Sequence, residues 1–236
     1  MITTFLFDLD GTLLPMDQER FIKAYIGGLA AKMAPHGYKP ELLVSSIWKG
    51  TEAMVRNDGL RGNEEIFWET FSAVCGRDTR ADEPIFREFY ETEFQNVKHS
   101  CGFDPRAKAV IDLLKQRGFR VVLATNPLFP AIATHSRARW AGLRPEDFEL
   151  ITTYENSRHC KPNPDYYQDI LDTLQLKPEE CVMVGNDVDE DMIAGKLGME
   201  VFLLTDCLIN KSGTDISRYP HGSFEELLGY IGGLNP

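Results

Sequence analysis

Asp8 and Asp10 are two carboxylates separated by one residue, in the run FDLDGT that spans residues 7–12. Side chains alternate along a strand, so both would point the same way where a strand ends here. Two carboxylates that share a small site repel, and they either recruit a divalent cation or leave one of them protonated at a raised pKa. Either state is useful in catalysis, because one carboxylate can attack an electrophile while its neighbour transfers the proton. The alternative is that both acids only cap a turn at Gly11.

Two later segments carry side chains that could hold an anion. Thr125 and Asn126 follow an apolar run, where a hydroxyl and the backbone N–H groups of a turn could hydrogen-bond an oxyanion. The same pair is also typical of an ordinary turn and helix cap. Lys161 lies in the run CKPNP, where two prolines hold it on a rigid approach to a helix. Its ammonium could neutralise the carboxylate pair and a bound phosphate, or it could be a solvated surface charge.

A cluster of acids follows Gly185 in the run GNDVDED, residues 185–191. Oxygen ligands of this kind, completed by water, form the octahedral sites that Mg²⁺ prefers. Acids in the first turn of a helix are also stabilised by the helix dipole, which is the purely structural interpretation.

The elements that would position these residues alternate between strand and helix. Apolar runs typical of strands buried on both faces occupy residues 3–9, 119–125, 148–153, 181–185 and 200–205. Helices are predicted between them, with a cap and a proline at Asp104-Pro105 and Asn163-Pro164, and with a capping box at Ser223. This order predicts a doubly wound α/β fold with a mainly parallel, Rossmann-like sheet.

Residues 17–98 interrupt the alternation with helical patterns alone, predicted at 17–33, 40–57, 63–75 and 82–97. Such an insertion after the first strand predicts a second, all-helical domain over the carboxyl edge of the sheet, where these folds bind ligands. We therefore expect a catalytic core of residues 1–15 and 100–236 and a helical cap of residues 16–99.

Charge and cysteine content narrow the classes of function. The 236 residues carry a formal net charge of −11, which disfavours nucleic acid and anionic membranes as partners and leaves a small anionic substrate open. The five cysteines form no spaced framework, which favours a reducing cytoplasm. The first residues contain no basic region, and Asp8 ends their apolar run, so neither a signal peptide nor a membrane span is expected there.

Taken in order, the four segments resemble the motifs of the haloacid dehalogenase superfamily of aspartate-nucleophile hydrolases. The resemblance covers the whole predicted core, and the helical block is similar to that family's cap. It implies that Asp8 is the nucleophile and a Mg²⁺ ligand. It implies that Asp10 is the acid/base, with its backbone carbonyl on the metal. Thr125, with Asn126 beside it, is similar to the phosphate-holding motif, and Lys161 to the charge-neutralising lysine.

The fourth motif departs from the family pattern, because Asn186 stands where an acid usually follows the glycine. We expect Asp187 to be the direct metal ligand and Asp191 to support it from behind. An ungapped alignment would instead place Asn186 at the metal, and Asp189 is a reserve candidate.

The resemblance implies a Mg²⁺-dependent phosphatase that acts on a small phosphorylated metabolite through an aspartyl-phosphate. Asp10 argues against a dehalogenase, which lacks this second acid. A phosphomutase of the same superfamily, a receiver-like phospho-switch and a degenerate, binding-only member are the alternatives. Lys49, Arg56 and Arg61 lie near predicted helix ends in the cap and could pair with a substrate carboxylate or second phosphate.

Overall fold

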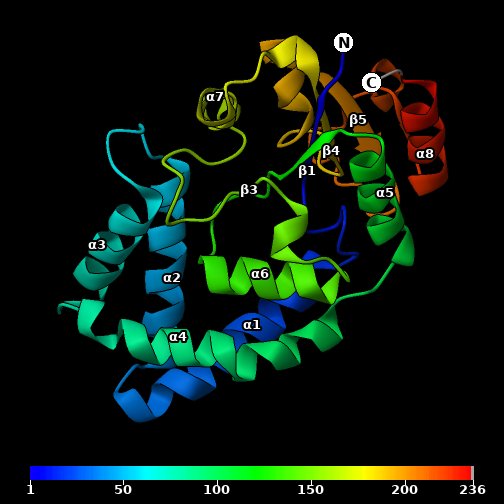
Figure 1. The fold of residues 1–236 in the computed structure, drawn as a ribbon. Coiled ribbons are helices and arrows are strands. Elements are labelled where there is room, and N and C mark those ends of the chain that lie inside the picture. Colours follow the sequence, from blue (N-terminus) through cyan, green and yellow to red (C-terminus); the bar gives the residue numbers. More distant parts are fainter. Residues whose placement is uncertain (235–236) are drawn as a thin grey trace.

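The computed structural model describes residues 1–234 and contains one sheet with the strand order β3-β2-β1-β4-β5-β6 (Figure 1). Each neighbouring pair of strands in this sheet is parallel. The strands are β1 (Thr4–Phe7), β2 (Arg120–Leu123), β3 (Leu150–Ile151), β4 (Cys181–Gly185), β5 (Glu200–Leu204) and β6 (His221–Gly222). The predicted α/β class with a parallel, Rossmann-like sheet is confirmed.

The α-helices of the described residues are α1 (Gln18–Met33), α2 (Pro40–Val55), α3 (Asn63–Cys75), α4 (Glu83–Glu91), α5 (Pro105–Gln116), α6 (Ala131–Trp140), α7 (Pro164–Leu174) and α8 (Phe224–Gly233). The three predicted helix caps are confirmed. The Asp104 and Asn163 side chains cap α5 and α7, and Ser223 forms a capping box with Glu226 at α8.

The structure differs from the prediction in three elements. The expected helix 82–97 is divided at Thr92 into α4 and the 3₁₀ helix η3 (Glu93–Ser100). The Thr92 hydroxyl donates to the Glu88 carbonyl at 2.7 Å, a side-chain bond that often bends a helix. The strand expected at 148–153 is only two residues long, and β6 was not predicted, because elements this short carry no periodic signal.

Helices cover the sheet on both faces. Alternate residues of β1 point to opposite faces, so Phe5 and Phe7 pack in the cluster that contains α5 and α8, while Leu6 packs in the cluster that contains α7. Figure 1 shows α5 and α8 on one side of the sheet and α7 on the other. The strands are buried on both faces, which explains their continuous apolar runs.

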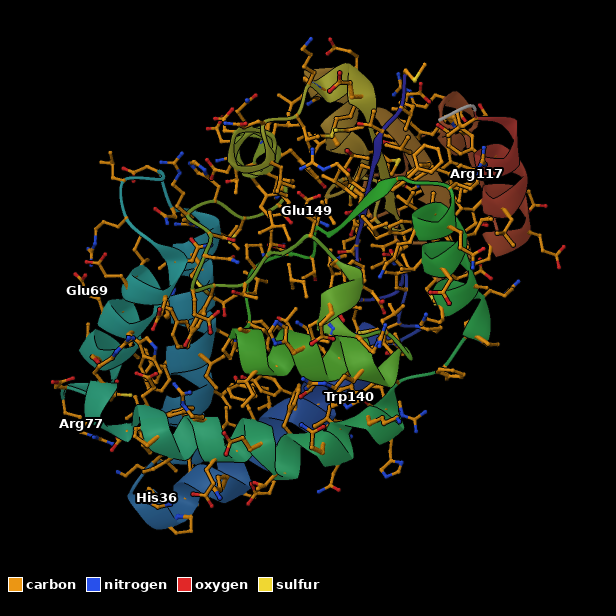
Figure 2. All side chains as sticks on the ribbon, viewed as in Figure 1. His36, Glu69, Arg77, Arg117, Trp140 and Glu149 are labelled. Atoms are coloured by element: carbon orange, nitrogen blue, oxygen red, sulfur yellow. The ribbon has the colours of Figure 1, made fainter. Side chains whose placement is uncertain are left out.

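The segment from α1 to η3 is helical and lies to one side of the sheet (Figure 1). Its two ends meet, because Met16 bridges Cys101 and the Gly102 N–H donates to the Pro15 carbonyl at 2.7 Å. Its core is continuous with the apolar cluster of the sheet. Figure 2 shows Trp140 on the side of α6 that faces this segment, and its ring centroid lies 5.0 Å from that of Phe94 on η3. The division into a core and a cap stays a prediction.

Candidate active site

The residues that the sequence predicts for catalysis and phosphate binding lie at the carboxyl edge of the sheet. Asp8 follows β1, Thr125 follows β2 and Asn186 follows β4, and β1 lies between the other two strands. Parallel strands end at the same edge, so the sheet itself brings these three residues together. They line one cavity of about 200 Å³, together with Asp10, Asn126, Asp187, Glu190 and Asp191.

Lys161 is fully buried between two carboxylates. Its Nζ lies 2.9 Å from Asp8 Oδ1 and 2.6 Å from Asp191 Oδ1. Burial alone would lower the pKa of Lys161, but the charges of Asp191 and Asp8 outweigh it and hold the pKa well above its ordinary value. The ammonium is therefore a fixed positive charge beside Asp8 and is not the solvated surface charge that the sequence also allowed.

Asp191 holds two other parts of the site in position. Its Oδ2 accepts from the Asp187 N–H at 3.0 Å while its Oδ1 holds Lys161, so it fixes both the lysine and the loop after β4. Burial raises the pKa of Asp191, and the Lys161 ammonium opposes that rise. Gly185 makes this contact possible, because a Cβ there would collide with the Asp191 carboxylate.

Arg137 on α6 is a site residue that the sequence analysis missed. Its guanidinium pairs with Asp10 Oδ2 and lies 4.4 Å from the centre of the Phe129 ring. Burial raises the pKa of Asp10, and the charge of Arg137 opposes the rise. The sequence carried no clear signal for this residue, because α6 has no apolar stripe that would identify its buried face, and Arg137 becomes buried only in the folded protein.

We predict that Arg137→Met destabilises the protein by about 3 kcal/mol. This is the lower end for breaking a buried ion pair, because the Asp10 side chain is still 23% exposed. Urea unfolding of the purified variant measures the change. Arg139→Met on the same helix is the matched control, and since Arg139 is exposed it should shift stability by less than about 0.5 kcal/mol. Equal stability of the two variants would contradict a structural role for the pair.

Thr125 and Asn126 hold the turn after β2. The Thr125 carbonyl accepts from the Thr152 hydroxyl at 2.7 Å and from the Tyr166 hydroxyl at 3.0 Å, which fixes this residue in the cavity wall. Asn126 Nδ2 donates to Glu190 Oε2 at 3.0 Å, whereas its buried Oδ1 has no partner among the described residues. An acceptor left free in this way is suited to a bound ligand.

Comparison with known proteins identifies this arrangement. Residues 2–198 match the family model of the haloacid dehalogenase-like hydrolases. The chain belongs to this family. The predicted membership and the prediction that the chain is an enzyme of the hydrolase class are therefore confirmed.

Individual relatives are more distant. Pyrophosphatase PpaX from Bacillus cereus (strain G9842) is 27% identical over 208 residues, covering 83% of this chain and 79% of that protein. A HAD phosphatase from Thermococcus onnurineus superposes with a TM-score of 0.62 at 20% identity, over 100% of both chains. The magnesium-bound HAD-hydrolase YfnB from Bacillus subtilis gives a TM-score of 0.58 at 20% identity, covering 98% of this chain and 99% of that one. At these identities the two solved structures support the fold alone.

Two of the candidate metal ligands in the fourth motif already accept hydrogen bonds through a side-chain oxygen. The Asn186 Oδ1 accepts from the Thr12 hydroxyl at 2.9 Å, and its amide packs on Gly11, whose φ is +88°. Asp187 Oδ1 caps the next turn by accepting from the N–H groups of Asp189 and Glu190. Asp189 is exposed and does not line the cavity, whereas Glu190, which was not predicted, does.

The cavity suits a hard cation in its chemistry. Its lining includes the carboxylates of Asp8, Asp10, Asp187, Glu190 and Asp191. The cations that pair with these carboxylates in the described structure are Lys161 and Arg137, so negative charge is in excess. Buried Asp10 Oδ1 has no partner among residues 1–234. The same residues contain no preformed cluster of three His, Cys, Asp or Glu ligands. The donors therefore fit Mg²⁺ bound through one or two carboxylates and water.

The structure does not bring the three predicted cap cations to this cavity. Lys49 and Arg56 both pair with Glu52 on α2, at 2.9 Å and 2.8 Å. Arg61 pairs with Glu65 at 2.8 Å and with Glu69, which Figure 2 shows on the outer side of the helical segment. Neighbouring acids at helical spacing thus occupy all three cations at the surface.

Proposed function

We propose that this protein is a Mg²⁺-dependent phosphatase that hydrolyses a small phosphate monoester through an aspartyl-phosphate at Asp8. The observation that carries the proposal is the position of Asp8 beside the fixed charge of Lys161 and in the same cavity as Asp10 and Thr125. Phosphoryl transfer needs positioning and compensation of negative charge more than any other contribution. These four residues supply a nucleophile, an acid/base, a cation and a hydroxyl.

In the first step, an Asp8 carboxylate oxygen attacks phosphorus and the bond to the leaving oxygen breaks. Asp10 donates a proton to that oxygen, so the product leaves as a neutral alcohol. In the second step, the Asp10 carboxylate takes a proton from water, whose oxygen attacks phosphorus and releases phosphate and free Asp8. Lys161 and the Thr125 hydroxyl hold the phosphoryl oxygens. Mg²⁺, held by Asp8, the Asp10 carbonyl and Asp187 or Asn186, would compensate charge on the phosphoryl group.

Two other activities use the same core. Pyrophosphate is a candidate substrate because PpaX, the relative described above, is a pyrophosphatase. A phosphomutase would share the nucleophile and the acid/base and differ in the region over the cavity. The receiver-like switch is set aside, because the matched family is one of hydrolases.

The setting we propose is the cytoplasm, with a small phosphorylated metabolite as the partner. All five cysteines are free thiols in the structure, which is consistent with a reducing compartment. Among residues 1–234, none of the helices has both the length and the apolar character needed to cross a bilayer.

We predict that removal of Mg²⁺ with EDTA abolishes phosphate release from p-nitrophenyl phosphate and that added Mg²⁺ restores it. The physical reason is the excess of carboxylates at the cavity, which repels an anionic substrate unless a cation is bound. Release of p-nitrophenolate measures the rate, and circular dichroism in EDTA checks that the fold persists. Undiminished turnover in chelator would show that the metal assignment is wrong.

A further inference from the structure

A second cavity of about 270 Å³ lies between the helical segment and the loop after β2. Its wall is mostly apolar and includes the rings of Tyr25, Phe67, Trp68, Phe86, Phe129 and Tyr154. We call it the aromatic chamber. Ile22, Leu128 and Phe129 line both the chamber and the cavity that contains Asp8, so the two spaces share a wall.

Two pairs of polar aromatic side chains in the chamber bind one another, and the chamber is also lined by the carboxylates of Glu83 and Glu155. The hydroxyls of Tyr25 and Tyr90 lie 2.9 Å apart, and Trp68 Nε1 donates to the Tyr154 hydroxyl at 3.3 Å. Among the described residues of the lining, the one cation is Arg87, and it lies 3.5 Å from Glu83. The chamber therefore offers no unpaired positive charge among these residues for a carboxylate or a second phosphate.

The position of Asp10, the proposed acid/base, indicates where the leaving group of the substrate lies. A general acid acts within hydrogen-bond reach of the oxygen it protonates, so the leaving oxygen must lie beside Asp10. Asp10 pairs with Arg137, the Arg137 guanidinium stacks on Phe129, and the Phe129 ring centre lies 5.3 Å from that of Tyr25 in the chamber. These contacts connect Asp10, through Arg137, to Phe129, which lines both the cavity of Asp8 and the chamber.

We propose that the aromatic chamber binds the organic part of the substrate and that this part is an uncharged apolar group, aromatic or alkyl. The proposal rests on the proposed phosphatase function and adds the substrate class to it. The size agrees, since a dry apolar cavity of about 150 Å³ holds benzene, and this chamber is larger. A phosphate monoester whose organic part is apolar matches such a lining better than pyrophosphate or a metabolite with a second charged group.

Binding of alkylphosphonates tests the chamber without requiring turnover. Ethylphosphonate and n-hexylphosphonate have the same charged head and differ by four methylenes, and complete burial is worth about fourfold in affinity for each methylene. With incomplete burial, we expect the hexyl compound to bind at least about tenfold more tightly by calorimetry in Mg²⁺.

Two substitutions to tryptophan on α2 test whether the preference for the hexyl compound arises in the chamber. Thr51 lines the chamber, so Thr51→Trp should fill part of it and reduce the hexyl preference to less than about threefold. Ser45 is exposed and lies outside the lining, so Ser45→Trp should keep the wild-type preference. Equal affinity for the two phosphonates, no binding of either at millimolar concentration, or a preference that Thr51→Trp leaves unchanged would overturn the proposal.

Turnover of ethyl and n-hexyl phosphate separates this proposal from the proposed function. The two esters have leaving groups of closely similar acidity, so a higher kcat/KM for the hexyl ester reports the chamber. Phosphate release from both esters at equal kcat/KM would support the proposed phosphatase activity and would overturn the proposal that the chamber binds the organic part of the substrate. Tighter binding of the hexyl phosphonate, with no phosphate release from any ester, would support binding in the chamber and would overturn the proposed phosphatase activity.

Discussion

Asp8→Asn should lower phosphate release by at least about 10⁴-fold, since removal of a nucleophile costs about 10⁶-fold in a well-studied hydrolase. An amide does not attack phosphorus in place of the carboxylate, so no phospho-enzyme forms. The fold should persist, because Asn has nearly the same shape as Asp and its oxygen can still accept from Lys161, which keeps Asp191 as an anionic partner. Single-turnover assays and mass spectrometry of acid-quenched enzyme measure the rate and the phospho-enzyme.

Asp189→Asn is the matched control for this variant. It makes the same chemical change in the acid run after β4, at a residue that is exposed and outside the cavity, and it should leave turnover unchanged. Thermal unfolding of both variants near the wild-type temperature shows that the loss is chemical. Near-normal turnover of Asp8→Asn would show that Asp8 is not the nucleophile.

Asp10→Asn should lower the turnover of an alkyl phosphate more than it lowers the turnover of p-nitrophenyl phosphate. The variant keeps the attacking carboxylate but cannot protonate the leaving oxygen. An alkoxide needs that proton, whereas p-nitrophenolate leaves without it. Loss of a general acid typically costs 10²–10⁴-fold, so we expect the rate ratio between the two esters to change by about 10²-fold or more.

The ratio of the two rates is the measurement, because damage to the metal site or to the fold would slow both esters together. In the Asp10→Asn variant, the side-chain amide oxygen can still accept from Arg137, so the buried guanidinium keeps a partner. Thermal unfolding and Mg²⁺ binding by calorimetry check both points. Equal slowing of the two esters with Mg²⁺ binding intact would show that Asp10 is not the general acid.

Local patterns in the sequence were enough to predict the elements and the edge at which the chemistry lies. Continuous apolar runs predicted buried parallel strands, and the parallel sheet in turn places Asp8, Thr125 and Asn186 at one edge. The capped helices at Asp104 and Asn163 were also predictable, because caps and prolines act within one helical turn.

The cations show where such local reasoning fails. Lys161 was predicted, whereas Arg137 was not, and Arg61 was proposed for a substrate but pairs with glutamates at the surface. The sequence records each charge but not which distant carboxylate will be within a few ångströms of it. Only the tertiary packing of α6 decides that Arg137 meets Asp10.

The sequence alone was sufficient to predict that the chain is a hydrolase of this family and that it carries a pair of carboxylates at the end of its first strand. The tertiary structure decided what surrounds that pair: Arg137 on Asp10, Glu190 in the cavity and the aromatic chamber behind Phe129. The physical reason is the range of the interactions. Strand alternation, helix caps and turn glycines act between near neighbours in the chain. The ion pair of Asp10 and Arg137 joins residues 127 positions apart, and it exists only after folding, as do the cavities.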